Sequence, residues 1–272
     1  MASLGQIIFY IMITLIVIFS AIIILIVSLT LSGNSQVESL NRLPVANLGE
    51  DYILSCFLPA DSEQSTFEKV SITWRKKSLE GIVYRYEDGA ENNAEQDSQY
   101  RGRVEIFSDL VLKGNASLLL RKVRLRDAGE YTCSLSHSGG GGDIKINLRT
   151  AAFTAPTFTF SSGVLTAVAS RWFPQPNVTW LDAEDNVLQG STDFIESSAG
   201  IFRVISTLGS VNVSDTYTCR IKNDLVASNS DATVTTGSVT PGEAYFTYSA
   251  ASAQLTSYLR VITFLLCVTY LM

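Results

Sequence analysis

A set of residues that occurs twice along the chain constrains its fold more than any other feature of the sequence. In the first copy, Cys56 and Trp74 precede the heptapeptide Asp-Ala-Gly-Glu-Tyr-Thr-Cys, which ends at Cys133. In the second copy, Trp180 precedes Asp-Thr-Tyr-Thr-Cys, which ends at Cys219. A Cys, a Trp and a Tyr-x-Cys in this order are typical of two facing β-sheets that are joined by one disulfide, with the indole packed against it. The repeat therefore predicts two such sandwiches.

This pattern is that of the immunoglobulin fold, so we expect an all-β chain with two tandem immunoglobulin-like sandwiches. In the first, at 37–149, Cys56 and Cys133 are expected to form the disulfide, and Trp74 and Tyr131 are expected to lie in the core. The two cysteines are 77 positions apart, which leaves room for the extra edge strands of a variable-type domain.

The second sandwich, at 153–236, is expected to be constant-type, because the spacing from Trp180 to Cys219 is too short for extra edge strands. Trp180 and Tyr217 are predicted core residues. Ala167, 13 residues before Trp180, occupies the position of the expected first cysteine. Cys219 is thus an unpaired thiol, which is either buried and unreactive or bridged to another chain. If it is buried, the domain lacks the roughly 2–5 kcal/mol that such a bridge contributes and should melt below the first.

Hydrophobic segments lie at both ends of the chain. Residues 7–31 carry no charge and would span about 37 Å as a helix, so we interpret 1–33 as a cleaved signal peptide or, alternatively, a retained signal anchor. Residues 237–254 are rich in Gly, Ser, Thr and Ala and are expected to form a stalk. Residues 255–272 follow small residues and a spacer, which is typical of a glycosylphosphatidylinositol signal; a type I single-pass helix is the alternative.

Three Asn-x-Ser/Thr triplets, at Asn115, Asn177 and Asn212, are candidate glycosylation sites between these ends. Together with the N-terminal targeting segment and the cysteine pair, they indicate the oxidising secretory pathway. We expect a membrane-anchored protein on the external side of the plasma membrane.

The composition argues against several other function classes. A net charge of −6 argues against a nucleic-acid partner. The single histidine, His137, and the absence of Cys-x-x-Cys argue against a metal site, and no residue set indicates catalysis, a cofactor or a small-molecule substrate. Arg103 and Asp127 are interpreted as a structural ion pair. The chain is therefore not expected to be an enzyme.

An exposed surface remains as the candidate functional site. In a variable-type domain the sheet that carries Trp74 and Cys133 has an exposed outer face, and side chains alternate between the faces of each strand. Alternation from these two residues predicts five outward side chains, which are Thr73, Arg75, Thr132, Ser134 and Ser136. Tyr84 and Tyr86, on the adjacent strand, either join this face or cap the sheet edge. Because Tyr and Arg are enriched in binding hot spots, we predict that these seven residues bind a receptor.

Several segments resemble a known family. Trp172-Phe-Pro-Gln-Pro before Trp180, the order variable-type then constant-type, and the heptapeptide ending at Cys133 are similar to the B-seven and butyrophilin-like ligands of T-cell receptors. The similarity covers nearly the whole chain. Three further segments narrow it to an inhibitory member of that family, at 1–7, 99–103 and 114–118.

The resemblance implies a cell-surface immune-checkpoint ligand that reduces T-cell activation, proliferation and cytokine production. It also implies a protein counter-receptor on T cells, contacted through the variable-type domain. Ala167 departs from the family's cysteine pattern, which concerns the stability of the second domain and not the contact surface. The alternative function is a homophilic adhesion molecule of the immunoglobulin superfamily, whose ectodomain would bind cells that express the same protein.

Overall fold

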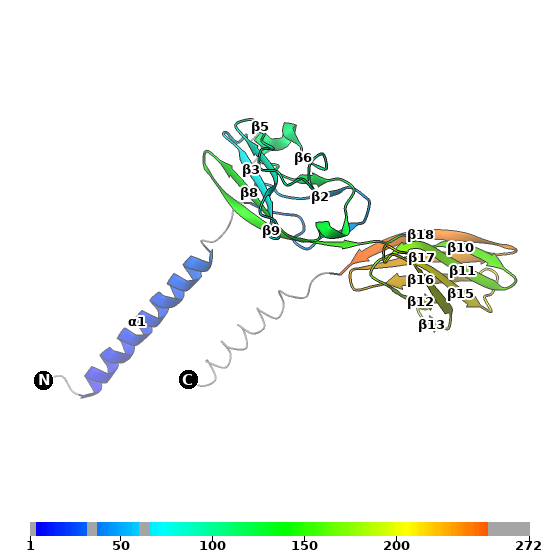
Figure 1. Ribbon diagram of the computed structural model, residues 1–272. Coiled ribbons are helices and arrows are strands. Elements are labelled where there is room, and N and C mark those ends of the chain that lie inside the picture. The colour runs from blue at the N-terminus through cyan, green and yellow to red at the C-terminus, as the bar shows by residue number, and fades with distance from the viewer. Residues whose placement is uncertain (1–3, 32–36, 60–65, 250–272) are drawn as a thin grey trace.

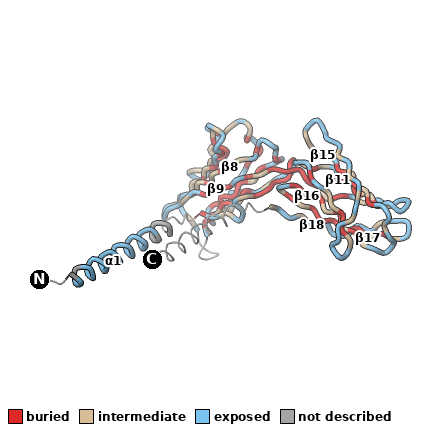
Figure 2. Tube along the Cα trace, turned by 90° about the horizontal axis from the view of Figure 1, so that it is seen from below, coloured by how far each residue is buried: buried red, intermediate tan, exposed pale blue. Residues whose placement is uncertain are grey.

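The computed structural model describes residues 4–31, 37–59 and 66–249, and contains one long helix and two β-sandwiches (Figure 1). The helix α1 spans Leu4–Leu31, and it is exposed where its burial is described (Figure 2). Within the described residues, Ile8–Ile26 is the one helical segment that is long and apolar enough to cross a membrane, a property that signal sequences share. The C-terminal segment 255–272, interpreted above as an anchor or a lipid-anchor signal, lies outside the described residues.

The first sandwich consists of a six-stranded and a three-stranded sheet. The strands of the larger sheet are, in spatial order, β1 (Val45–Asn47), β9 (Gly140–Ala151), β8 (Gly129–His137), β3 (Ser71–Lys76), β4 (Ile82–Glu87) and β5 (Ala90–Glu91). The smaller sheet contains β2 (Tyr52–Leu54), β7 (Leu118–Leu120) and β6 (Val104–Ile106). Two 3-10 helices lie in the connections on either side of β7, η1 (Ser108–Lys113) and η2 (Leu125–Asp127). Strands β4 and β5 are the extra edge strands of a variable-type domain.

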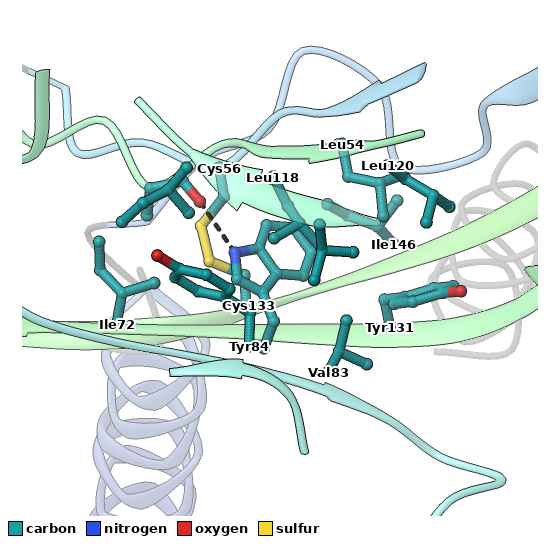
Figure 3. Packing of buried hydrophobic residues seen from close by; sticks show 14 of the residues in the cluster. Leu54, Cys56, Ile72, Val83, Tyr84, Leu118, Leu120, Tyr131, Cys133 and Ile146 are labelled. Atoms are coloured by element: carbon teal, nitrogen blue, oxygen red, sulfur yellow. Dashed lines mark hydrogen bonds between the residues drawn. A yellow bond between two sulfur atoms is a disulfide. The ribbon is translucent and has the colours of Figure 1, made fainter. Parts of the chain in front are cut away.

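The core of the first sandwich is built around the disulfide between Cys56 and Cys133 (Figure 3). Trp74 is fully buried, and its indole N–H donates to the Ala116 carbonyl oxygen at 2.9 Å. The hydroxyl of Tyr131, also fully buried, donates to the Asp127 carbonyl oxygen at 2.7 Å. A bridge that closes a loop of 77 residues stabilises a domain by about 4 kcal/mol in the chain-entropy model.

Arg103 and Asp127 form an ion pair inside the first sandwich. The Asp127 side chain is 0% exposed, and its Oδ2 accepts from Arg103 Nη2 at 2.5 Å and from the Arg124 backbone N–H at 2.8 Å. Arg103 also donates to the carbonyl oxygens of Gln99, Arg121 and Lys122. The pair thus connects η2 with the segment before β6 and the segment after β7, which is a structural role.

The second sandwich consists of a four-stranded and a five-stranded sheet. The strands of the first of these sheets are β10 (Thr157–Ser161), β11 (Val164–Trp172), β15 (Phe202–Gly209) and β14 (Ser191–Glu196). The other sheet contains β13 (Val187–Leu188), β12 (Asn177–Leu181), β16 (Thr216–Lys222), β17 (Val226–Thr235) and β18 (Ser238–Tyr248).

The core of the second sandwich contains no disulfide. Cys219 is fully buried, in the same hydrophobic cluster as Ala167 and Trp180. Burial raises the pKa of the Cys219 thiol to about 12, so the thiol is protonated at neutral pH. The Trp180 indole N–H donates to the Ser206 hydroxyl at 2.9 Å, and because Trp180 lies in β12 and Ser206 in β15, this hydrogen bond joins the two sheets. Tyr217, largely buried, accepts from the Asn212 backbone N–H at 2.9 Å.

The prediction of a stalk at 237–254 is wrong for most of its described part, because residues 238–248 form β18. This strand pairs antiparallel with β17, from Thr235 opposite Ser238 to Val226 opposite Tyr248. Its Phe246 packs against the core of the second sandwich, with its ring centroid 5.1 Å from that of Phe153. The second sandwich therefore has two edge strands beyond the seven of a constant-type domain, β18 and β13. The prediction that the spacing from Trp180 to Cys219 leaves no room for an extra edge strand is wrong, because β13 lies in that interval and pairs with β12.

The two sandwiches make direct contacts where β9 leads from one into the other. Asn47 donates through Nδ2 to the Phe153 carbonyl oxygen at 3.1 Å, and its Oδ1 accepts from the Phe153 N–H at 3.2 Å. Phe153 itself packs in the core of the second sandwich. Arg149, near the end of β9, donates through Nη2 to the carbonyl oxygen of Ser249, directly after β18, at 2.8 Å. These hydrogen bonds restrict movement between the domains.

Candidate protein-binding face

The candidate site is the outer face of the six-stranded sheet. Thr73 lies opposite Ser134, and Arg75 lies opposite Thr132. Their strand neighbours Ile72, Trp74, Cys133 and Leu135 are buried in the core, so alternation turns the intervening side chains outward. The structure thus brings together on one face the five positions that alternation predicted, which are Thr73, Arg75, Thr132, Ser134 and Ser136.

The prediction that Tyr84 and Tyr86 belong to this face is wrong. Tyr84 pairs with Trp74 and is 4% exposed, and Figure 3 shows its side chain among those of the core. Desolvation in this position raises the pKa of Tyr84 to about 12. Tyr86 pairs with Ile72 and packs against the core, half-buried. Residues that pair directly across strands point to the same face, so both tyrosines point inward with Trp74 and Ile72.

Residues that the sequence reasoning missed complete the face. Arg85 is paired with Thr73 on β4, and its Nη2 lies 3.0 Å from Glu95 Oε2. On β9, Asp143 lies opposite Ser134, and Lys145 lies opposite Thr132. The sequence did contain a signal for the β9 residues, since Asp143 and Lys145 alternate with the buried Ile144 and Ile146. For Arg85 it contained none, because the register of β4 depends on pairing.

A shallow hollow of about 320 Å³ lies at one end of this face. The residues that line it include Ser71, Thr73, Ser134, Ser136, Gly141 and Asp143. Gly141 has φ +159°, and a Cβ at this position would overlap the Leu135 carbonyl oxygen and the Ser136 Cα. A side chain therefore does not fit there, and the glycine run forms a wall of the hollow.

Several charges on the face are already paired, whereas those of Arg75 and Asp143 are not. Glu130 Oε1 lies 3.7 Å from Lys145 Nζ and 3.9 Å from Lys77 Nζ. Within the described part of the chain, neither Arg75 nor Asp143 has an ion-pair partner. A protein partner can therefore form new charge-assisted hydrogen bonds at these two positions without breaking existing ones.

His137 has a local structural role beside the hollow. Its ring centroid is 4.8 Å from that of Phe67, and its Nδ1 accepts from the Gly139 N–H at 3.1 Å. Over residues 4–31, 37–59 and 66–249, no group of three His, Cys, Asp or Glu side chains is placed to hold a metal ion.

The three candidate glycosylation sites lie outside the six-stranded sheet. Asn177 and Asn212 are exposed in the second sandwich. Asn115 is half-buried just before β7, and its Oδ1 accepts from the Ser117 N–H at 2.9 Å. None of the three asparagines lies on a strand of the candidate face, so glycans at these positions would not be attached to that face.

Comparison with known proteins relates both sandwiches to described families. Residues 41–149 match the immunoglobulin V-set domain, and residues 163–230 match the Ig-C domain described as butyrophilin subfamily 3 member A2-like. These ranges fall in the first and second sandwich and confirm the predicted order of variable-type then constant-type domains.

Two relatives match this chain over most of its length. The chain is 37% identical over 244 residues to the human protein named V-set domain-containing T-cell activation inhibitor 1, with 86% of each chain covered. It is 36% identical over 248 residues to the rat protein of that name, covering 88% of this chain and 87% of the relative. The crystal structure of the human B7-H4 IgV-like domain is 37% identical, with a TM-score of 0.38, and covers 43% of this chain and 96% of that one.

Proposed function

The chain belongs to the family of V-set domain-containing T-cell activation inhibitors, related to the butyrophilins, and from this premise we propose that it is a cell-surface ligand that reduces T-cell activation by binding a counter-receptor. The contact is made by the outer face of the six-stranded sheet. Lower T-cell proliferation and cytokine production follow from signalling in the cell that carries the receptor.

The unpaired charges of Arg75 and Asp143 carry this proposal. They lie on β3 and β9 of one sheet, with small hydroxyl side chains on β8 between them. A receptor that presents a carboxylate to Arg75 and a cation to Asp143 gains two charge-assisted hydrogen bonds, and complementary charge also speeds association. Many such contacts between two apposed membranes add up through multivalency, so that a weak single contact suffices.

The scaffold under this face supports the proposal. Trp74 and Cys133 lie directly beneath it on β3 and β8, and the disulfide connects β8 to the segment that follows β2. A binding surface on paired strands is held more rigidly than one on loops, so less conformational entropy is lost on binding.

Charge reversal tests the proposed face. Cells that display the full chain, or its variants Arg75→Glu and Asp143→Lys, are cultured with stimulated T cells, and T-cell proliferation and cytokine release are measured at equal surface expression. Each reversal is expected to weaken receptor binding by at least about tenfold and to relieve inhibition, because it places like charges together. The matched control is Arg101→Glu, which reverses an exposed arginine in the turn before β6. If both face variants inhibit T cells as well as the wild type does, the proposed face is wrong.

The same two charges favour homophilic adhesion as the second candidate function. A surface that carries one unpaired cation and one unpaired anion can bind a second copy of itself around a two-fold axis, with Arg75 of each copy near Asp143 of the other. This alternative predicts that cells displaying the chain aggregate with one another, and that the double reversal Arg75→Glu with Asp143→Lys restores aggregation that each single reversal abolishes. Inhibition of T cells without such aggregation supports the ligand.

We also propose that the C-terminal segment 255–272 attaches the protein to the membrane, either as a glycosylphosphatidylinositol signal or as a single-pass helix. Treatment of intact cells with a phospholipase specific for that lipid anchor is expected to release the protein in the first case. Retention after complete release of a control lipid-anchored protein identifies the helix.

A further inference from the structure

One of the three candidate glycosylation sites lies on the outer face of the five-stranded sheet. Strand β12 places Asn177 opposite Lys222 on β16. Thr179, the third residue of the same Asn-x-Thr triplet, lies opposite Arg220. Ile221, between Arg220 and Lys222, is buried in the core, so alternation turns its two neighbours and their partners on β12 outward. Asn177 itself is exposed, as an acceptor of an N-linked glycan has to be.

A hollow of about 380 Å³ lies beside Asn177 on this outer face. It is formed by β16, β17 and β18, the next three strands of the sheet after β12 (Figure 1). Adjacent strands lie about 4.8 Å apart, so the hollow extends from about 5 Å to about 14 Å from β12. A glycan that leaves Asn177 toward β16 therefore passes directly over it. The residues that line the hollow include Arg220, Lys222, Asn229, Thr247 and Ser249.

The hollow presents hydrogen-bond donors that the protein itself does not use. Arg220 Nε donates to Asn229 Oδ1 at 2.7 Å, which orients the guanidinium group and leaves its terminal N–H groups without a partner among the described residues. Asn229 is only 7% exposed, and its Nδ2 has no acceptor in the described part of the chain. Neither Arg220 nor Lys222 forms an ion pair there. Hydroxyl and amide oxygens, which N-acetylglucosamine carries, accept hydrogen bonds from such donors.

Covalent attachment makes a weak contact with the hollow sufficient. A glycan on Asn177 is tethered beside the hollow, so its effective concentration there is high and a few hydrogen bonds are enough to hold it. The other exposed site of this sandwich, Asn212, lies far from the hollow. The Ser214 N–H near it donates to the Val234 carbonyl oxygen at 2.8 Å, whereas the hollow lies at the Val226 end of β17, about 26 Å along the strand.

We propose that Asn177 carries an N-linked glycan whose first two N-acetylglucosamine units bind in this hollow through Arg220, Lys222 and Asn229. The proposal requires that the chain passes through the secretory pathway, as a cell-surface protein does, and it is independent of the receptor-binding face. A glycan held flat on the five-stranded sheet excludes protein partners from this face of the second sandwich and leaves the outer face of the six-stranded sheet open.

Lysine acetylation tests the proposal with the full chain. The protein is produced in secretory cells that build only oligomannose glycans, so that an endoglycosidase can trim each glycan to its first sugar on the folded protein. Occupancy of Asn177 is measured by glycopeptide mass spectrometry, and the acetylation rate of each lysine is measured before and after trimming. Lys222 is expected to react about fivefold more slowly before trimming, the effect of one net hydrogen bond. The exposed Lys77 of the first sandwich serves as the internal reference.

Two pairs of variants separate binding in the hollow from simple crowding by the glycan. Arg220→Gln keeps the glycan but removes a donor group and is expected to lose most of the protection of Lys222, whereas Arg203→Gln, an exposed arginine on the opposite sheet, keeps it. Asn177→Gln is expected to raise the Lys222 rate at least to its value after trimming, and Asn212→Gln is expected to leave that rate unchanged. Trimming leaves the sequence unaltered, so it provides the same comparison if a variant folds poorly.

Three results would overturn the proposal. The first is a chain from secretory cells that carries no glycan at Asn177. The second is a Lys222 acetylation rate that does not change on trimming. The third is equal protection of Lys222 in the wild type and in Arg220→Gln, which would show that the glycan shields the lysine without binding in the hollow.

Discussion

The two sandwiches share an immunoglobulin core pattern but hold their sheets together in different ways. The first is closed by the disulfide between Cys56 and Cys133 and by the buried charge of Asp127. The second has a lone buried thiol at Cys219, and its sheets are joined by the hydrogen bond from Trp180 to Ser206. The covalent link therefore lies under the proposed binding face, and the domain without it lies next to the proposed membrane attachment.

The cores differ in the size and polarity of their side chains as well. The largest fully buried side chains of the first core are mostly leucine, isoleucine and aromatic rings. Small or polar side chains occupy many central positions of the second core, which include Ala167, Ala169, Ser206, Ser228, Ser230 and Ala232. Smaller apolar side chains bury less apolar area, so they stabilise the domain less. Both differences predict that the second sandwich unfolds before the first.

The largest difference is expected when the motif aspartate of each sandwich is removed. Asp127→Ala leaves the Arg103 guanidinium buried without its anion and should destabilise the first sandwich by about 3–5 kcal/mol. Asp215→Ala is the matched change in the second sandwich. There the carboxylate is exposed and accepts from Asn212 Nδ2 at 3.0 Å, so the loss should stay below about 1 kcal/mol. Denaturant unfolding of the full chain measures both, and equal losses would contradict the comparison.

Removal of the disulfide should reduce the gap in stability between the sandwiches. Cys56→Ala with Cys133→Ala is expected to cost the first sandwich about 2–5 kcal/mol. The reciprocal change, Ala167→Cys, provides Cys219 with the partner that it lacks and is expected to stabilise the second sandwich by about 2–4 kcal/mol. Mass spectrometry without reductant detects the new bridge, and calorimetry of each variant measures the change. A bridge that forms without any gain in stability would show that the missing disulfide is not the weakness of this domain.

A smaller effect is expected at the hydrogen bond that joins the sheets of the second sandwich. Ser206→Ala leaves the buried Trp180 N–H without an acceptor and should cost about 1–3 kcal/mol. The control is the double change of Ser228 and Ser230 to Ala. Their hydroxyls are buried 3.2 Å apart, and removal of both partners together is nearly neutral. If the control costs as much as Ser206→Ala, general loosening of the core is the cause and not the lost hydrogen bond.

The sequence was sufficient for the parts of the fold that depend on local packing. The Cys, Trp and Tyr-x-Cys residues of this motif pack together in the core between the two sheets. The positions of Cys56, Trp74 and Cys133 therefore predicted which segments form the facing sheets of the first sandwich. They also fixed the alternation on β3 and β8, because each of these strands contains a residue whose inward direction is known. The five outward positions on those strands follow directly.

The errors fall where pairing between strands decides the outcome. The inward direction of Tyr84 follows from its pairing with Trp74 across the hairpin, where the register shifts between Trp74 and Arg75. Alternation along β4 alone leaves that register undetermined. Strand β18 contains Pro241 and Gly242, which are typical of linkers, and Pro241 pairs beside a register shift between Ser230 and Ala232. It becomes a strand because the edge of β17 offers hydrogen-bond partners.

Pulsed alkylation of Cys219 in the full chain tests the central comparison most directly. Because Cys219 is fully buried and its pKa is raised to about 12, the thiol does not react with iodoacetamide while the second sandwich is folded. The sample is heated in steps, and alkylation of Cys219 and hydrogen exchange of the β3 and β8 amides are measured on the same aliquots by mass spectrometry. Our account predicts that Cys219 becomes reactive at temperatures at which β3 and β8 are still protected. Loss of protection in β3 and β8 at the same temperature as Cys219 alkylation, or below it, would contradict the account.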